Sequence, residues 1–102
     1  MIILSEAKVD VLNLGEYKSF HIFFPENLTY TKKLIVFTFP FDGENSNLYV
    51  LERGQQILKD LFSCCGVKEI LVCGKCLCVK VDREYAERIE RVLKSHGIKI
   101  VS

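Results

Sequence analysis

The sequence lacks the features that would place this chain in a membrane. Its longest apolar run, residues 34–41, contains Thr38 and Pro40 and is far shorter than the roughly 20 residues that a membrane-spanning helix needs. Residues 1–4 are too few for the apolar region of a signal peptide, and they have no basic region before them. We therefore expect a soluble protein of the cytoplasm that has no membrane partner.

The chain also lacks an excess of charge of either sign. Its 14 Lys and Arg residues oppose 13 Asp and Glu residues, which leaves a formal net charge of +1 at pH 7. Nucleic acids attract proteins through clustered positive charge, and this balance provides none. Exposed aromatic residues can stack on bases, but a buried core or a subunit interface explains the alternating Ile35, Phe37, Phe39 and Phe41 better. We therefore expect no nucleic-acid partner.

Catalytic signatures are missing as well. The sequence shows no nucleophile beside a base, no carboxylate pair and no phosphate-binding loop. His21 alternates with apolar residues in an expected strand, and His96 precedes Gly97 at an expected helix end, where an imidazole complements the helix dipole. We therefore expect a protein without catalytic residues, which is not an enzyme.

What the chain does contain is a cluster of thiols. All five cysteines lie between Cys64 and Cys78, and three of them fall in the six residues that begin at Cys73. Residues 68–81 are rich in β-branched and apolar side chains and are interrupted only by Gly74-Lys75. A glycine at the first central position suits a type II′ turn, so this stretch predicts a hairpin with a two-residue loop.

The register of that hairpin determines which side chains share a face. Cys73 would lie opposite Cys76, and Leu71 opposite Cys78, so that all three thiols share the more polar face. The opposite face is apolar and would belong to the core; it carries Ile70, Val72, Leu77, Val79 and Val81. The thiols are therefore expected on the side of the sheet that faces away from the core.

The spacing of these thiols allows a metal site. Opposed residues in a hairpin have Cβ atoms about 4.5 to 5.5 Å apart, close enough for a soft metal to bridge Cys73, Cys76 and Cys78. Zinc and iron are the candidate ions, and we assign the three cysteines as candidate metal ligands. A closed tetrahedral site needs a fourth ligand, however.

The fourth ligand has to come from elsewhere. Cys64 and Cys65 end an expected helix on the core side of the sheet, and Cys65 lies four residues after Leu61, which places it on the apolar face. A complete site would therefore need His21, His96, a partner chain or an exchangeable external ligand.

Two other interpretations of the cysteines remain open. Cysteine often behaves as a small hydrophobic residue, and three thiols on a strand face can simply pack beneath another segment or subunit. This is the interpretation that we favour. A redox or disulfide role is the third possibility, but an odd number of cysteines without a signal peptide fits a reducing compartment better than a disulfide framework.

The pattern along the chain predicts an α+β fold with a largely antiparallel sheet and two helices packed on one face. The expected elements are strands at 2–12, 17–24 and 34–39, a helix at 55–64, the hairpin at 68–81, a second helix, and a final short strand or tail at 98–101. Residues 48–51 fit either a strand or the start of the first helix. From Leu34 onward the order is that of a ferredoxin-like or related topology, preceded by an N-terminal β-hairpin. We expect one domain, residues 1–102.

The second helix has clear boundaries in the sequence. Asp82 is a suitable N-cap, and Gly97 is a suitable residue for ending the helix. The stripe expected to be buried consists of Tyr85, Ile89, Val92 and Leu93.

One stretch resembles a known family. The segment Leu61-Phe62-Ser63-Cys64-Cys65-Gly66-Val67-Lys68-Glu69-Ile70, a tight turn and then Leu77-Cys78-Val79 resembles the N-terminal domain of Nfu/NifU-type iron-sulfur cluster scaffold proteins, mainly over residues 57–81. That family joins a helix ending in Leu-Phe to a Gly-Val-Lys strand and then a hairpin.

The resemblance implies an accessory or protein-interaction domain associated with iron-sulfur cluster assembly, with a protein partner or a homo-oligomer. The cluster-binding Cys-x-x-Cys of the family belongs to a separate domain, so Cys73 and Cys76 do not inherit that role. The alternative is a ferredoxin-like module that binds zinc or iron through the hairpin cysteines or binds a small regulatory ligand. No cofactor is implied beyond these two ions.

Overall fold

The computed structural model describes residues 6–39 and 50–100, and these residues form an antiparallel sheet and two α-helices. The strands are β1 (Lys8–Leu14), β2 (Tyr17–Phe23), β3 (Ile35–Thr38), β4 (Val67–Cys73) and β5 (Cys76–Asp82), and the helices are α1 (Glu52–Phe62) and α2 (Ala86–Ser95), the latter preceded by a 3-10 turn, Arg83–Tyr85. The predicted α+β class is confirmed.

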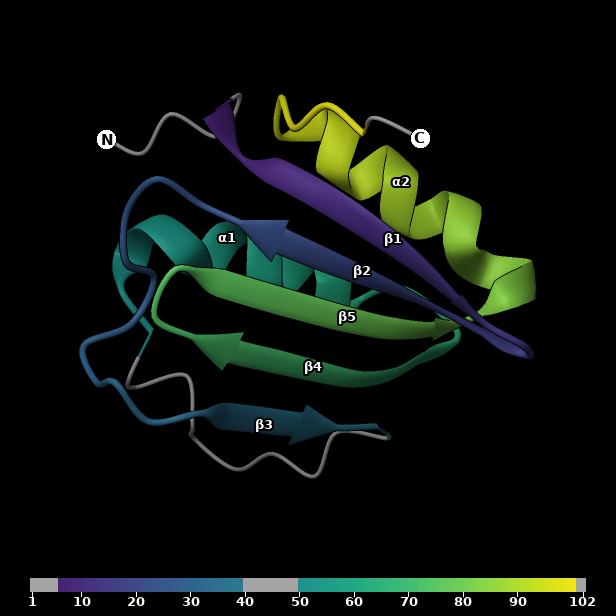
Figure 1. Ribbon diagram of the computed structural model, residues 1–102, viewed down its shortest axis with the longest axis horizontal. Helices are drawn as coiled ribbons and strands as arrows, with labels where there is room; N and C mark the ends of the chain where they lie inside the picture. The colour runs from purple at the N-terminus through teal and green to yellow at the C-terminus, as the bar shows by residue number, and fades with distance from the viewer. Residues whose placement is uncertain (1–5, 40–49, 101–102) are drawn as a thin grey trace.

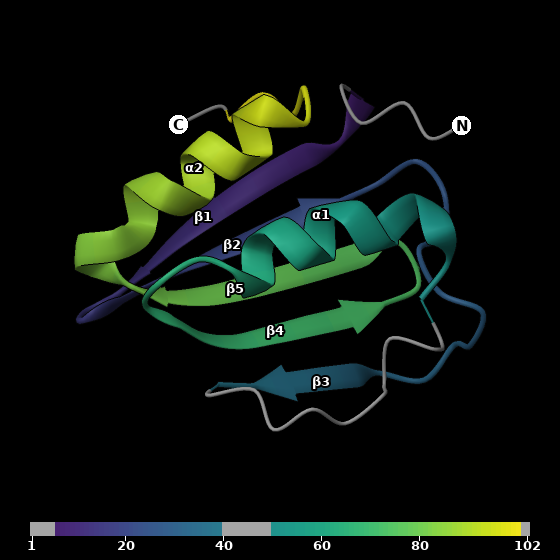
Figure 2. The same cartoon turned by 180° about the vertical axis from the view of Figure 1, so that it is seen from behind.

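The sheet has the strand order β1-β2-β5-β4-β3, and every neighbouring pair is antiparallel (Figure 1). Both helices lie on one face, α1 over the middle of the sheet and α2 beside β1 (Figure 2). No described helix covers the other face, which is turned toward the viewer in Figure 1. The predicted N-terminal hairpin is therefore present, and it joins the rest of the sheet through β2 and β5.

The β4–β5 hairpin has the predicted register. Cys73 pairs with Cys76, and Leu71 pairs with Cys78. Gly74 has a φ of 56°, while Lys75 does not have a positive φ. Only the first central residue of a type II′ turn needs a positive φ, so the glycine occupies the position that the turn requires.

The core lies between the sheet and the helices. One face of each strand contributes to it, because side chains alternate along a strand. The fully buried members include Phe20 and Ile22 of β2, Ile70 and Val72 of β4, Leu77, Val79 and Val81 of β5, Ile57 and Leu61 of α1, and Ile89 and Leu93 of α2. All five hairpin residues predicted for the core are buried there, as are Ile35 and Phe37 of β3.

The end of α1 differs from the prediction. The helix spans Glu52–Phe62 rather than 55–64, and Ser63 is its C-cap. Because the chain has left the helix by this point, helical spacing no longer places Cys65 on the apolar face: Cys65 is exposed, and Cys64 is half-buried. The prediction that Cys65 joins the core was wrong.

Other boundaries were also corrected. The first strand begins at Lys8 within the described residues, and its predicted start at 2–5 lies outside them. Val50 forms an isolated bridge with Thr29, and Leu51 is the N-cap of α1, while residues 48 and 49 lie outside the described part.

The predicted final strand is not formed at residues 98–100. Ile98 is buried, and its backbone N–H donates to the carbonyl oxygen of Leu93, 2.9 Å away, which turns the chain back onto α2 after Gly97. The β-α-β-β-α-β order is thus not completed by the described residues. The sheet instead gains its remaining strands from the N-terminal hairpin.

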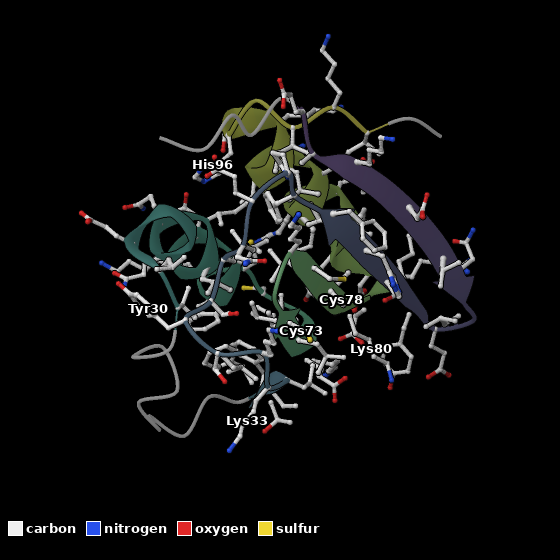
Figure 3. All side chains as sticks on the ribbon, turned by 60° about the vertical axis from the view of Figure 1, so that its left-hand side comes forward. Tyr30, Lys33, Cys73, Cys78, Lys80 and His96 are labelled. Carbon is white, nitrogen blue, oxygen red and sulfur yellow. The ribbon has the colours of Figure 1, made fainter. Side chains whose placement is uncertain are left out.

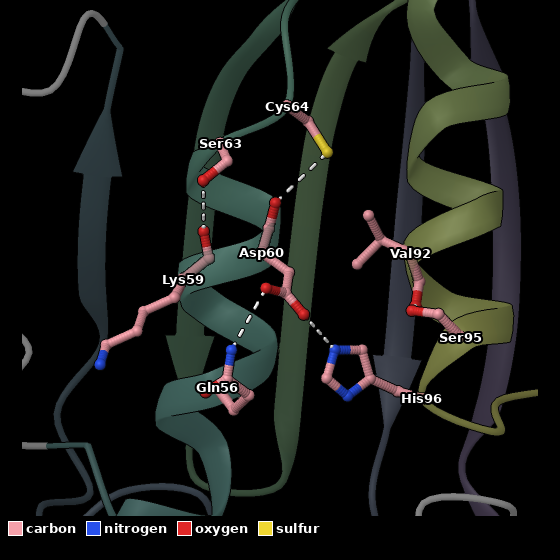
Figure 4. A network of polar contacts seen from close by, with 8 residues as sticks. All are labelled: Gln56, Lys59, Asp60, Ser63, Cys64, Val92, Ser95 and His96. Carbon is pink, nitrogen blue, oxygen red and sulfur yellow. Dashed lines mark hydrogen bonds and ion pairs between the residues drawn. The ribbon is translucent and has the colours of Figure 1, made fainter.

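The two helices are joined by a polar contact at their surface (Figure 4). His96, the C-cap of α2, has its Nε2 2.6 Å from Oδ2 of Asp60 on α1. The same carboxylate accepts from the side-chain amide of Gln56, 3.3 Å away. This imidazole therefore orients α2 against α1.

Gly66 is the residue that connects α1 to β4. Its φ is 84°, and a Cβ added to it would lie 2.3 Å from Cδ2 of the Tyr85 ring. Gly15, in the β1–β2 turn, also has a positive φ, 72°, but a Cβ there would meet no atom within 4 Å. Two glycines with the same backbone requirement thus differ in the space around them.

We predict that Gly66→Ala lowers the free energy of unfolding by about 3 kcal/mol, because left-handed strain of about 1 kcal/mol adds to a steric overlap of similar or larger size. Gly15→Ala is the matched control and should lose only about 1 kcal/mol, since strain alone acts there. Urea denaturation of both variants measures the difference. Equal losses would show that contact with Tyr85 does not restrict this junction.

Candidate functional site

The three hairpin cysteines lie on the face of the sheet that neither described helix covers, as the alternation of the strands predicted. Cys73 is the last residue of β4, and Cys76 and Cys78 are the first and third residues of β5. Figure 3 shows Cys73 and Cys78 on the side of the sheet away from α1, while His96 lies on the helix side. We call this side, built from the outward residues of β1 to β5, the open face.

Cys76 and Cys78 form a pair of neighbouring thiols. Their sulfur atoms are 3.6 Å apart, within the range of a weak S–H to S hydrogen bond. Both side chains are half-buried. Residues two apart on a strand project from the same face, which brings the two thiols together without a turn.

His21 extends this pair onto the next strand. The β2–β5 register places His21 opposite Cys78, and the Nδ1 of His21 lies 3.5 Å from the Cys78 sulfur. The other ring nitrogen, Nε2, lies 3.0 Å from the hydroxyl oxygen of Ser19. The open face therefore contains a continuous chain of polar contacts from Cys76 through Cys78 and His21 to Ser19.

Cys73 is directed differently. Its side chain is exposed, and its thiol donates to the carbonyl oxygen of Lys32, 3.8 Å away, in the segment before β3. Cys73 is opposite Cys76 in the ladder, but the contact recorded for its sulfur leads toward the sheet edge and not along β5.

The remaining candidate ligands lie on the helix side. The Cys64 thiol donates to the backbone carbonyl of Asp60, 3.4 Å away, and His96 contacts the carboxylate of the same residue (Figure 4). Of the two histidines considered for the site, the structure brings only His21 to a hairpin thiol.

No group of three or more His, Cys, Asp and Glu side chains in the described residues is arranged to hold a metal ion. The assignment of zinc or iron to Cys73, Cys76 and Cys78 stays a prediction. The structure places Cys76 next to Cys78 and Cys78 next to His21, and the sequence indicated His21 only as one possible source of a fourth ligand. No sequence signal paired β2 with β5, and that pairing decides the contact.

Burial controls the chemistry of the Cys78 thiol. Desolvation raises the pKa of Cys78 to about 12, and the hydrogen bond and charge of Cys76 add to the effect. Burial also raises the pKa of Cys64, and the neighbouring Cys65 contributes. Because the thiolate is the nucleophile, neither residue is activated for attack at neutral pH.

Apolar and charged residues surround the thiols on the open face. Phe23 lies opposite Cys76 on β2, and Leu71 lies opposite Cys78 on β4. Two residues after Cys78 on β5, the ammonium group of Lys80 lies 4.6 Å from the centre of the Tyr17 ring. This contact is a cation–π interaction that holds one positive charge close to the sheet.

Comparison with known proteins identifies the fold. No family model matches this sequence, and no curated protein matches it either. The crystal structure of protein SAV1430 from Staphylococcus aureus is similar, with a TM-score of 0.51 and 15% sequence identity over 83% of this chain and 96% of that one. At this identity the likeness concerns the fold alone.

Among the described residues, neither α1 nor α2 has the length and the apolar sequence that crossing a membrane requires.

We predict that the five cysteines react with an alkylating reagent at clearly different rates. Exposed Cys65 and Cys73 should react first, and Cys78 should react at least about ten-fold more slowly at pH 7.5, because its raised pKa leaves little thiolate. Timed labelling with N-ethylmaleimide, mapped by peptide mass spectrometry, measures each rate. Labelling of Cys78 as fast as Cys73 would contradict the burial that the structure gives it.

Proposed function

We propose that this chain is a non-enzymatic protein-interaction domain that binds its partner through the open face. The observation that carries the proposal is the distribution of exposed apolar side chains. Leu12 and Leu14 of β1 remain 47% and 49% exposed, and Phe23 of β2 and Val36 of β3 are 44% and 46% exposed. Phe23 and Val36 project from the open face because their strand neighbours are buried, and Leu12 and Leu14 do so because they alternate with Val9 and Val11, which face the core.

Apolar exposure of this kind is unusual for the solvent side of a sheet. An antiparallel sheet with one wet face normally alternates apolar residues inside with polar residues outside. Here the outward positions include leucine, valine, phenylalanine and three thiols, while the helix-facing side is already filled. Exposed apolar side chains on one sheet face, interspersed with charged residues such as Asp10 and Lys80, support a protein-binding role for this face.

The nature of the partner is proposed from the resemblance described above. A domain similar to the N-terminal domain of Nfu/NifU-type proteins would act as an accessory domain in iron-sulfur cluster assembly. The helix, glycine and strand junction on which the resemblance depends is present at Phe62, Gly66 and Val67. This supports the local likeness, and the partner we propose is a protein of the cluster-assembly machinery.

We predict that a purified iron-sulfur scaffold protein perturbs amide resonances of β1, β2 and β5 and leaves those of α1 and α2 unchanged. Combined Leu12→Ser and Phe23→Ser should weaken binding about ten-fold or more, since apolar anchors at an interface typically contribute 1 kcal/mol or more each. Titration of the ¹⁵N-labelled chain, followed by two-dimensional NMR, gives both the surface and the affinity.

Tyr30→Ser is the matched control, because Tyr30 is 73% exposed but lies away from the open face (Figure 3). It should leave the affinity unchanged. Shifts on the open face that depend on concentration without any partner would identify a second copy of this chain as the occupant. Absence of binding, or shifts confined to the helices, would contradict the proposal.

A further inference from the structure

The thiol and imidazole groups of the open face point to a second property, which does not depend on the partner proposed above. We propose that Cys76, Cys78 and His21 form a three-ligand site for a borderline or soft metal ion, with zinc as the reference ion and a fourth position open to solvent. This set replaces Cys73 with His21. It rests on the contacts that the structure gives these three side chains.

Two of the three distances between the proposed ligand atoms already match tetrahedral coordination. Zinc bonds of about 2.3 Å to sulfur and about 2.0 Å to nitrogen place two sulfur ligands about 3.8 Å apart, and a sulfur and a nitrogen about 3.5 Å apart. The measured separations are 3.6 Å from Cys76 to Cys78 and 3.5 Å from Cys78 to His21. Each pair, taken by itself, has the spacing of two ligands of one ion.

The third distance, between the Cys76 sulfur and the His21 ring nitrogen, is the one that metal binding has to shorten. Cys76 and His21 are diagonal neighbours on β5 and β2, a relation that separates two residues by about 7 to 8 Å, with their Cβ atoms somewhat closer. Because Ser19 and Cys78 hold the ring of His21, Cys76 is the side chain that changes rotamer to bring its sulfur toward the ion. This explains why the side chains do not already form a complete group of three.

Ser19 positions the imidazole for this role. Its buried hydroxyl lies 3.0 Å from Nε2 of His21, so the ring is held with Nδ1 toward Cys78. Either neutral tautomer satisfies both contacts, but binding through Nδ1 selects the one in which Nε2 carries the proton and donates to Ser19. Metal-bound histidines usually donate their second ring nitrogen in this way.

Binding replaces two thiol protons with one divalent ion. The S–H bonds of Cys76 and Cys78 break, two metal–sulfur bonds form, and the protons go to solvent. The site therefore has the same net charge before and after zinc binds. Mixed sulfur and nitrogen ligands suit zinc, and three protein ligands leave one coordination position for water.

The test uses zinc and cobalt(II) as the probes, on the full chain prepared under reducing, metal-free conditions. We expect binding of one ion per chain, with cobalt(II) giving the visible bands of tetrahedral coordination and a near-ultraviolet band from sulfur-to-metal charge transfer. Cys76→Ser and Cys78→Ser should each reduce the charge-transfer band by about half, because a site with two thiolates loses one. His21→Gln should keep that band but weaken zinc binding about ten-fold or more.

Two matched controls separate this site from other thiol sites. Cys65→Ser removes an exposed thiol in the segment after α1, and Cys73→Ser removes the hairpin thiol that contacts Lys32. Both should bind zinc as the unmodified chain does. Ser19→Ala should weaken zinc binding about ten-fold without changing the charge-transfer band, as expected for a positioning residue.

Three results would overturn the proposal. Absence of zinc or cobalt binding at micromolar concentrations removes the site altogether. Loss of binding in Cys73→Ser with no effect of His21→Gln would place the ion among the three hairpin thiols. A similar affinity in all variants would indicate adventitious binding. Circular dichroism shows whether each variant folds, and Cys78→Ala and His21→Asn replace any variant that does not.

Discussion

The pairing of β2 with β5 is the contact on which the rest of this structure depends. Seven residue pairs, from Tyr17 with Asp82 to Phe23 with Cys76, join the N-terminal hairpin to the β4–β5 hairpin. On the helix side the ladder brings Phe20 and Ile22 beside Val79 and Leu77 in the core. A slip of one residue would turn every one of these side chains to the opposite face, so burial of the apolar residues excludes such a slip.

The same register creates the arrangement on the open face. His21 shares the open face with Cys78 because Phe20 and Ile22 lie on the helix side of the same strand, and the observed register places the two residues opposite each other. The position of the imidazole is therefore a consequence of core packing, and its direction comes from the Ser19 hydroxyl. Core and candidate site cannot be varied independently: a change that shifts β2 along β5 would separate the ring from the thiol.

Local features of the fold could be predicted from the sequence, and contacts between distant segments could not. The β4–β5 hairpin follows from Gly74 and from alternation over a few residues, and the structure has that register. Extending helical spacing past Phe62 failed for Cys65, because helix ends depend on where the chain has to enter the next strand. The final strand was wrong for a similar reason, since Ile98 returns to α2 and is buried there. The partner of Cys78 depends on a contact 57 residues away in sequence, which alternation within either strand does not encode.

The two proposals for the open face are compatible, because an ion at the proposed site would change its shape and rigidity more than its charge. Without a metal, the contacts of Cys76, Cys78 and His21 form a hydrogen-bonded network in which the raised pKa of Cys78 keeps its thiol protonated. Zinc that replaces two thiol protons adds no net charge, but it links β2 and β5 by coordinate bonds, and Cys76 is turned toward the ion. Phe23 lies opposite Cys76, so a change of rotamer at Cys76 alters the apolar surface beside it. A partner that recognises Phe23 would therefore distinguish the two states by contact rather than by electrostatic attraction.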